Sequence, residues 1–449
     1  MSGQRLQGAS FLVLGLGTTG VALVRYLRAR GATVAVADSR AQPPGLAALH
    51  AAFPELSVHL GPFETLSFSP EQTVVVSPGL APESLPLAAM RAVGCPVRGE
   101  LDLFFEEARA PVLGITGTNG KSTVTALLGH LLKAAGLRVA VGGNLGPAAV
   151  SLLDGPAPEV FVLELSSFQL DWAELLPLRQ ALYLNLSSDH LDRYDDLAAY
   201  GASKARIYGR AERCLFNAGD AATTPPQEAL GRAIPVGPQV TGAPFGLGEG
   251  VLWGPEGWSW PLDRLPLVGA HNLENVLFAL TAAWDFGADL AALGPALESF
   301  TPLPHRCAVA GWVRGVRYVN DSKATNVGAT VAALKGLGDL AKVVLLAGGL
   351  AKGADLSPLR PAAAGLRHAF LFGTDAPALA AALGDACPLS CVDTLDAGLA
   401  KAVELASPGD TVILAPACAS FDQFRSFEHR GEVFEAAVAE LTDRLGACA

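Results

Sequence analysis

The stretch GITGTNGKST at residues 114–123 directly follows an apolar pair. A strand that ends in a glycine-rich turn, followed by Lys-Ser-Thr at the start of a helix, is the layout of a phosphate-binding loop. Its glycines let backbone N–H groups crowd around phosphate oxygens, and the helix N-terminus adds a positive dipole end. We expect Lys121 to reach the outer phosphates, and Ser122 or Thr123 to hold Mg²⁺. Because Ile115 stands where the strict pattern has glycine, the sequence predicts a variant loop that binds ATP or GTP.

The size and charge of the chain indicate how many domains it has and which kinds of partner it does not bind. It has 449 residues, half of them apolar, which is more than one ordinary core holds and predicts two or three domains. The formal net charge of −11 argues against nucleic acid and anionic membranes as partners. No apolar run reaches the roughly 18 residues of a membrane span. The first residues lack the layout of a signal peptide. We therefore expect a cytoplasmic enzyme without nucleic-acid or membrane partners.

Apolar runs alternate with helical patterns along most of the chain. This order predicts α/β domains with parallel sheets and helices on both faces. We expect three of them: a Rossmann-like N-terminal domain over residues 1–98, a central P-loop ATP-binding domain over 99–302, and an α/β C-terminal domain over 303–449. Because ligands bind at the carboxyl ends of parallel strands, the polar loops that follow the strands are the expected sites.

The sequence GLGTTG at residues 15–20 matches the GxGxxG pattern between a predicted strand and a predicted helix. With Asp38 at the end of the next strand, the pattern is the dinucleotide fingerprint, in which the acid contacts a ribose. The same backbone geometry serves any pyrophosphate, including that of a UDP-sugar. The motif therefore leaves open whether this domain binds NAD, as in an NAD-dependent oxidoreductase, or another diphosphate.

Two further candidates follow strands of the central block. Glu164 ends an apolar strand and could hold Mg²⁺ opposite Ser122, although an acid at a strand end can also simply face solvent. His190 lies in the loop NLSSDHLDRY at residues 185–194, which follows the next strand. A lone histidine is more often structural than a ligand, but this one is expected at the same sheet edge as Glu164.

The third block places four polar motifs after the interdomain linker or at strand ends. They are His305-Arg306, NDSKATN at 320–326, GGLAK at 348–352 and PACASFDQF at 416–424. If all four lie at one sheet edge, a third domain could close over the phosphate loop. Helix capping by Asp321, Ser322 and Ser420 is the alternative explanation.

These motifs together resemble those of the Mur ligases, the ATP-dependent amide-forming enzymes of peptidoglycan assembly. TGTNGKST is shared by the whole superfamily, including folylpolyglutamate synthases. GLGTTG, ELSSFQL at 164–170, NLSSDHLDRY, NDSKATN, PACASFDQF and FEHRG at 427–431 are narrower and resemble the members that add D-glutamate. The resemblance covers the whole chain. Alternatives are a Mur-type ligase for a different amino acid and a nucleotide-binding module without chemistry.

The resemblance implies domains that bind, in order, a UDP-muramoyl substrate, ATP and an amino acid. The implied substrates are UDP-N-acetylmuramoyl-L-alanine, D-glutamate and ATP, which react through an acyl phosphate with two Mg²⁺ ions, and GLGTTG would then serve UDP rather than NAD. We expect a monomer. Closure of the third domain would exclude water from the acyl phosphate.

The resemblance also implies roles for individual residues. Those implied to contact ATP are Gly117, Thr118, Asn119, Gly120, Lys121, Ser122, Thr123, Asn272, Asn275, Arg306 and Asp321. Those implied to contact the UDP substrate are Gly17, Thr18, Thr19, Asp38, Ser39, Arg40, Gly79 and Asn144. Those implied to surround D-glutamate are Arg193, Lys323, Thr325, Lys352, Ser420 and Phe427. The implied catalytic residues are Lys121, Glu164, His190 and Lys204, and the implied metal ligands are Ser122, Glu164, His190 and Lys204, the last as a carbamate.

Overall fold

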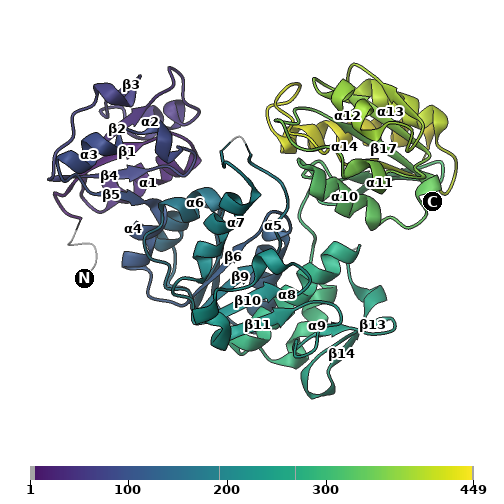
Figure 1. Ribbon diagram of the computed structural model, residues 1–449, viewed down its shortest axis with the longest axis horizontal. Helices are drawn as coiled ribbons and strands as arrows, with labels where there is room; N and C mark the ends of the chain where they lie inside the picture. The colour runs from purple at the N-terminus through teal and green to yellow at the C-terminus, as the bar shows by residue number, and fades with distance from the viewer. Residues whose placement is uncertain (1–5, 192, 268, 447–449) are drawn as a thin grey trace.

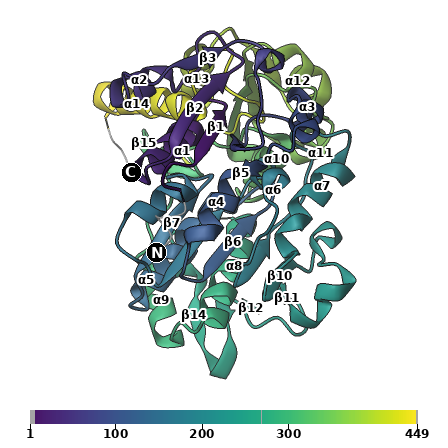
Figure 2. The ribbon, with the colours of Figure 1, turned by 90° about the vertical axis from the view of Figure 1, so that its left-hand side faces the viewer.

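Three large sheets, one in each domain, divide the protein into three α/β domains (Figure 1). The structure is a computed structural model that describes residues 6–191, 193–267 and 269–446. The N-terminal and C-terminal domains lie on the same side of the middle domain in both views (Figures 1 and 2). Within the described ranges, no helix is long and apolar enough to cross a membrane. The predicted fold class is confirmed.

The N-terminal domain is built on a five-stranded sheet with the order β3-β2-β1-β4-β5 and parallel pairing throughout. Residues 11–14 of β1 are all buried, as expected for a parallel strand with both faces covered. The strands are β1 (Ser10–Leu14), β2 (Thr33–Asp38), β3 (Val58–Leu60), β4 (Gln72–Val76) and β5 (Val97–Gly99), and the helices are α1 (Thr18–Ala29), α2 (Leu46–Ala52) and α3 (Leu87–Ala92).

The middle domain has a six-stranded parallel sheet with the order β11-β10-β9-β6-β8-β7 and a small antiparallel sheet, β12-β13-β14. Its strands are β6 (Val112–Thr116), β7 (Val139–Gly143), β8 (Val160–Glu164), β9 (Gln180–Tyr183), β10 (Arg213–Asn217), β11 (Ala233–Val236), β12 (Gly246–Leu247), β13 (Val251–Trp253) and β14 (Ser259–Pro261). Its helices are α4 (Glu100–Glu107), α5 (Lys121–Ala134), α6 (Ser167–Trp172), α7 (Leu197–Ala205), α8 (Ala270–Phe286) and α9 (Leu290–Glu298), with the 3₁₀ segment η4 at Ala149–Asp154.

The C-terminal sheet has the order β15-β16-β20-β17-β18-β19, and its edge strand β15 is antiparallel to β16. The two strands are joined through Arg314 and Gly315, with φ of 51° and 75°, and positive φ at both central residues is typical of a tight hairpin. The strands are β15 (Ala308–Val313), β16 (Val316–Asn320), β17 (Val343–Gly348), β18 (His368–Phe372), β19 (Leu389–Cys391) and β20 (Thr411–Leu414). The helices are α10 (Val327–Lys335), α11 (Leu359–Ala362), α12 (Ala376–Leu383), α13 (Leu395–Leu405) and α14 (Phe427–Leu445).

The N-terminal and middle domains share a continuous apolar core. Leu27 of α1, Phe104 of α4 and Val150 of η4 belong to one buried cluster that also reaches the strands of both sheets. The C-terminal domain has separate clusters on the two faces of its own sheet. The first two domains therefore pack as one unit, while the boundaries at 98/99 and 302/303 stay a proposal.

Candidate active site

The phosphate-binding loop connects β6 to α5, as the sequence predicts. Gly117 and Gly120 have φ of 153° and 80°, which side-chain-bearing residues rarely adopt. A Cβ at Gly120 would also collide with Oδ1 of Asn275. The amide of Asn185 braces the loop from the next strand, since its Oδ1 accepts from Asn119 N at 2.9 Å and its Nδ2 donates to Asn119 O at 3.1 Å. The backbone N–H and the carbonyl of Asn119 are thus both bonded to the side chain of Asn185.

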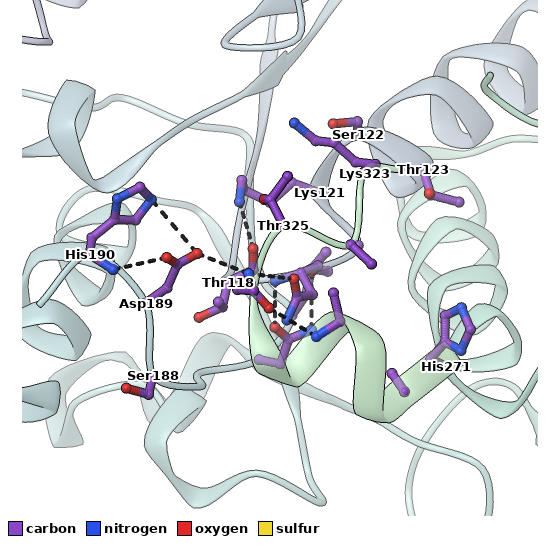
Figure 3. Close-up of a pocket in the computed structure, with 18 of the residues that line it drawn as sticks. Thr118, Lys121, Ser122, Thr123, Ser188, Asp189, His190, His271, Lys323 and Thr325 are labelled. Carbon is purple, nitrogen blue, oxygen red and sulfur yellow. Dashed lines mark hydrogen bonds and ion pairs between the residues drawn. The ribbon is translucent and has the colours of Figure 1, made fainter. Parts of the chain in front are cut away.

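A cavity of about 400 Å³ lies between the phosphate loop and the C-terminal domain (Figure 3). It brings together residues from α5, α7, α8, the ends of β8, β9 and β16, and the loop after β17. The predicted site residues that line it are Thr118, Asn119, Gly120, Lys121, Ser122, Thr123, Asn144, Glu164, His190, Lys204, Asn272, Asn275, Arg306, Asp321, Lys323, Thr325 and Lys352. The sequence missed His271, which also lines the cavity and which precedes Asn272 without any motif of its own.

Two lysines meet at one backbone carbonyl beneath this cavity. Lys121 Nζ donates to the carbonyls of Gly117 and Thr118, both at 2.9 Å, and Lys204 Nζ donates to the same Gly117 oxygen at 2.9 Å. Burial, together with the nearby charge of Lys121, places the pKa of Lys204 well below its ordinary value. Burial also lowers the pKa of Lys121. The surroundings therefore favour a neutral amine at Lys204.

One oxygen of the buried Glu164 carboxylate lacks a hydrogen-bond partner among the residues that the structure describes. Its Oε1 accepts from Asn144 Nδ2 at 2.6 Å, whereas Oε2 has no such partner although the side chain lies in the cavity wall. An unpaired buried carboxylate oxygen is costly unless a cation neutralises it. Ser122, in the first turn of α5, lines the same cavity, so oxygen ligands of the kind that Mg²⁺ prefers are present. Among the described residues no group of three His, Cys, Asp or Glu forms a ready-made metal site.

His190 and Asp189 lie in the loop after β9. His190 has φ of 55°, and its ring packs edge-on against Phe168 and Tyr200 at centroid distances of 4.8 and 5.9 Å. Asp189 Oδ1 accepts from His190 N at 2.9 Å, and its Oδ2 lies 3.8 Å from His190 Nε2 (Figure 3). These contacts hold the imidazole at the cavity wall, on the same sheet edge as Glu164.

The C-terminal domain contributes charged groups to the opposite wall. Burial raises the pKa of Asp321 to about 7, while its Oδ1 accepts from Cys307 N at 3.2 Å. Burial and the neighbouring charge of Arg306 lower the pKa of Lys323 to about 8. The ammonium of Lys323 lies 3.9 Å from the ring centroid of Phe427, the first residue of α14. A cation and an aromatic face are therefore paired where the amino acid is expected.

Three of the residues implied to surround D-glutamate, Arg193, Ser420 and Phe427, are not part of the cavity wall. Arg193 NH1 and NH2 donate to the carbonyls of Gly79 and Leu80 in the N-terminal domain, at 3.2 and 3.1 Å. Ser420 is 1% exposed, and the ring of Phe427 contacts the ammonium of Lys323, which lines the cavity. Their roles toward D-glutamate stay predictions.

Arg430 is a fully buried cation that donates hydrogen bonds to neutral oxygens. Its guanidinium donates to Ser322 O at 2.9 Å, Ser322 Oγ at 3.0 Å, Cys418 O at 3.1 Å and Gly348 O at 3.3 Å. Burial lowers its pKa to about 10. It ties together the three strand-end loops that follow β16, β17 and β20. The sequence contained Arg430 in FEHRG, but nothing in the motif indicated this role.

In the N-terminal domain, the carboxylate of Asp38 bonds to the loop after β1 and to Arg40, which follows β2. Its carboxylate accepts from Leu16 N at 2.6 Å, from Arg40 N at 2.9 Å and from Arg40 NH2 at 2.7 Å. Thr18, at the start of α1, lines a second cavity of about 410 Å³ between this helix and residues 147–151 of the middle domain. The implied residues Gly17, Thr18, Thr19, Ser39 and Arg40 thus gather at the carboxyl edge of β1 and β2.

Comparisons with known proteins agree with this geometry. Three family models match the chain: "Mur ligase MurD-like, N-terminal domain" at residues 9–99, "Mur ligase middle domain" at 115–231, and "Mur ligase, glutamate ligase domain" at 305–418. The chain is similar to the UDP-N-acetylmuramoylalanine–D-glutamate ligase of Nitrosococcus oceani, with 46% identity over 96% of this chain and 97% of the relative. The ligase of that name from Pseudomonas aeruginosa is 45% identical over 96% of this chain and 98% of its own length.

Solved structures show the same architecture. The UDP-N-acetylmuramate–alanine ligase of Thermotoga maritima superposes with a TM-score of 0.62 at 17% identity, over 96% of this chain and 99% of that chain. At this identity the likeness shows the fold alone. Together with the family models, it leads to one conclusion: the chain belongs to the Mur ligase family. The two relatives with 45 and 46% identity share one name within that family, the UDP-N-acetylmuramoylalanine–D-glutamate ligases.

Proposed function

We propose that this chain joins D-glutamate to UDP-N-acetylmuramoyl-L-alanine with the consumption of ATP, a step in peptidoglycan precursor synthesis. The observation that carries the proposal is the single cavity in which the phosphate loop and Glu164 face Lys323 of the C-terminal domain. This arrangement lets one domain activate a carboxylate while another presents an amine. In this proposal the enzyme acts in the cytoplasm as a monomer.

A free carboxylate does not acylate an amine readily because its oxygen is a poor leaving group, and reaction with ATP replaces it with a better one, phosphate. The terminal carboxylate of the UDP substrate attacks the γ-phosphate of ATP, which gives an acyl phosphate and ADP. The amine of D-glutamate then attacks the acyl carbon, and phosphate leaves with the C–O bonding electrons. The first step is phosphoryl transfer, in which positioning and charge neutralisation dominate. Lys121 supplies a fixed positive charge, and the backbone of residues 117–120 supplies N–H donors.

The residues present fit Mg²⁺. Ser122 and Glu164 would hold one ion, since Glu164 Oε2 is buried and no described residue hydrogen-bonds to it. His190 and a carbamate on Lys204 would hold the second. When bound, the ions supply positive charge that neutralises the phosphate oxygens. A neutral Lys204 amine is the form that adds CO₂, and its surroundings favour that form.

The incoming amino acid has two carboxylates, so its pocket needs cations or strong donors. Lys323 and Lys352 line the cavity, as does Thr325, and Phe427 offers an apolar face through its contact with Lys323. Inverting the α-carbon would leave one buried partner unpaired, which costs about 1–3 kcal/mol. In this proposal D-glutamate is the isomer that pairs with every partner, and L-glutamate is the one that leaves a partner unpaired.

One coupled assay tests the function: release of ADP with UDP-N-acetylmuramoyl-L-alanine and a panel of amino acids. We expect release with D-glutamate and little with L-glutamate, L-alanine, L-lysine or diaminopimelate. Comparable turnover with L-alanine or diaminopimelate would assign the chain to another Mur ligase activity. The family models match all three domains, and this favours a Mur ligase over the NAD-dependent oxidoreductase and over a nucleotide-binding module without chemistry.

A further inference from the structure

The C-terminal domain touches the phosphate loop through the first turn of α10. The two parts approach so closely there that a Cβ at Gly328 would lie 2.8 Å from Ser187 Oγ and 3.3 Å from Asn119 Nδ2. At the other end of the helix, a Cβ at Gly336 would lie 3.1 Å from the Cα of Gly269. We call this contact between α10 and residues 119, 187 and 269 the α10 seam. Glycine at Gly328 permits the approach.

Asn326 is the N-cap residue that precedes α10, and both polar atoms of its side chain make hydrogen bonds. Its Oδ1 accepts from Ala329 N at 2.9 Å and caps its own helix. Its Nδ2 donates across the seam to Asp189 Oδ2 at 2.9 Å and to Asn119 Oδ1 at 3.2 Å. The side chain is buried, so these bonds are shielded from water. One amide group thus bonds to two separate loops of the middle domain.

The two acceptors belong to the loops that carry the chemistry. Asn119 is part of the phosphate loop, and its own Nδ2 is directed at Ser187 Oγ at 3.4 Å, which leaves its Oδ1 facing Asn326. Asp189 precedes His190 and holds that residue's backbone N–H. On the other side, Thr325 stands next to Asn326 and lines the cavity. A bond at Asn326 therefore fixes the distance between the phosphate loop and the amino-acid wall.

We propose that Asn326 is a positioning residue that holds the C-terminal domain over the phosphate loop by donating to Asp189 and Asn119 at once. Its two bonds set the register in which the amine of the amino acid meets the acyl phosphate, and they keep water out of the α10 seam. The inference rests on the proposed function, to which it adds the contact that aligns the two reactants.

Substitutions can separate this role from helix capping. Serine and aspartate cap helices as well as asparagine does, so Asn326→Ser keeps the cap and loses both donors, and Asn326→Asp adds a charge opposite the Asp189 carboxylate. Gly328→Ala fills the α10 seam without touching Asn326, and alanine is the better helix former. Thr394→Ala is the matched control, because Thr394 caps α13 in the same domain by accepting from Ala397 N at 3.2 Å.

For Asn326→Ser we expect kcat to fall about tenfold, as for the loss of two hydrogen bonds, while the dissociation constant for ATP and the thermal midpoint stay unchanged. The KM for D-glutamate is expected to rise, and more phosphate is expected per amide formed because water reaches the acyl phosphate. Asn326→Asp is expected to lower kcat further than Asn326→Ser does. Gly328→Ala is expected to lower kcat about as much as Asn326→Ser does. Thr394→Ala is expected to lower the midpoint and leave the kinetics unchanged.

Small-angle X-ray scattering with a nonhydrolysable ATP analogue separates this inference from the proposed function. The parent chain is expected to have a smaller radius of gyration with the analogue than Asn326→Ser, whichever amino acid is the substrate. Equal radii together with equal kcat and KM would overturn the role of Asn326. Absence of amide formation from D-glutamate by the parent chain, with the difference in radius intact, would overturn the proposed function alone.

Discussion

The side-chain nitrogens of Lys121 and Lys204 both donate to the carbonyl oxygen of Gly117, each at 2.9 Å. Two ammonium groups on one acceptor repel each other, and burial adds to the cost of charging them. The repulsion and the burial both favour loss of the proton from Lys204, whose pKa lies well below its ordinary value. Lys121 and Lys204 are therefore expected to serve different purposes.

Lys204 is expected to carry a carbamate. The modification turns a potential positive charge into a negative one, which suits a position beside divalent cations. Native mass measurement of the intact protein is expected to show the mass of one added CO₂. Lys204→Arg, which keeps a cation but cannot form the carbamate, is expected to lack both this mass and activity. Full activity in protein shown to be unmodified would contradict the prediction.

Lys121 is expected to stabilise the negative charge that develops on the transferred phosphoryl group. Lys121→Ala should lower kcat at least about 10²-fold, as for the loss of a principal electrostatic stabiliser. Steady-state assays of ADP release measure the effect. Lys133→Ala, an exposed position in the last turn of the same helix, is the control and should leave kcat unchanged. Near-normal turnover by Lys121→Ala would refute the assignment of the phosphate loop.

The N-terminal domain is expected to bind UDP and not NAD. Asp38 accepts hydrogen bonds from Leu16 N and from Arg40, so its carboxylate fixes Arg40 and the loop after β1 at the strand edge where the diphosphate of the UDP substrate is expected. UDP should raise the thermal midpoint of unfolding, because a ligand that binds only the folded state stabilises it, whereas NAD should not. Protection by NAD without protection by UDP would reverse the assignment of this domain.

Lys323 is expected to make binding of D-glutamate depend on pH. Its pKa of about 8 means that the ammonium is charged below this pH and loses its charge above it. The KM for D-glutamate should therefore rise as the pH increases through about 8. Lys323→Arg keeps the charge and should remove this part of the profile, while the titration of the substrate amine remains. Identical profiles for the two proteins would count against a contact between Lys323 and the substrate.

Asp321 is expected to affect stability. Its pKa is raised from 3.8 to about 7 by burial, so the folded chain binds more protons than the unfolded chain between these values. The stability that this group contributes is fully present below pH 3.8 and is lost as the pH rises through about 7. Urea unfolding of Asp321→Asn at several pH values should show a flatter profile, whereas Asp385→Asn, at an exposed site, should match the parent. A profile unchanged in Asp321→Asn would disprove the shift.

The fold could be predicted from the sequence because the patterns that indicate it lie within short stretches of the chain. Residues 11–14 and 160–163 are apolar runs that end in polar loops, and parallel pairing then brings such loops to one edge whatever the details of packing. For the same reason Lys121 and Glu164 could be placed together. The sequence predicted parallel sheets, and the structure adds the antiparallel edge strand β15, which pairs with β16 in a hairpin.

The contacts that the sequence did not reveal are long-range. Arg430 bonds to Ser322, 108 residues away, and Asn326 bonds to Asp189, 137 residues away. No periodicity or spacing encodes which of several polar residues in a loop will turn inward. Arg193 shows the same limit, since its direction toward Gly79 depends on how the N-terminal domain packs against the middle domain.

The apolar core that runs from β1 into the middle domain has a consequence for synthesis of the chain. The cluster extends from Phe11 to Ala229, so the N-terminal domain cannot bury all its apolar surface when its own last strand leaves the ribosome. Its helix α1 waits for η4 at Ala149–Asp154, which packs against it, and chains generally fold domain by domain as they emerge. During that interval the nascent chain exposes the side chains that later join the domains, and chaperone binding is expected to concentrate there.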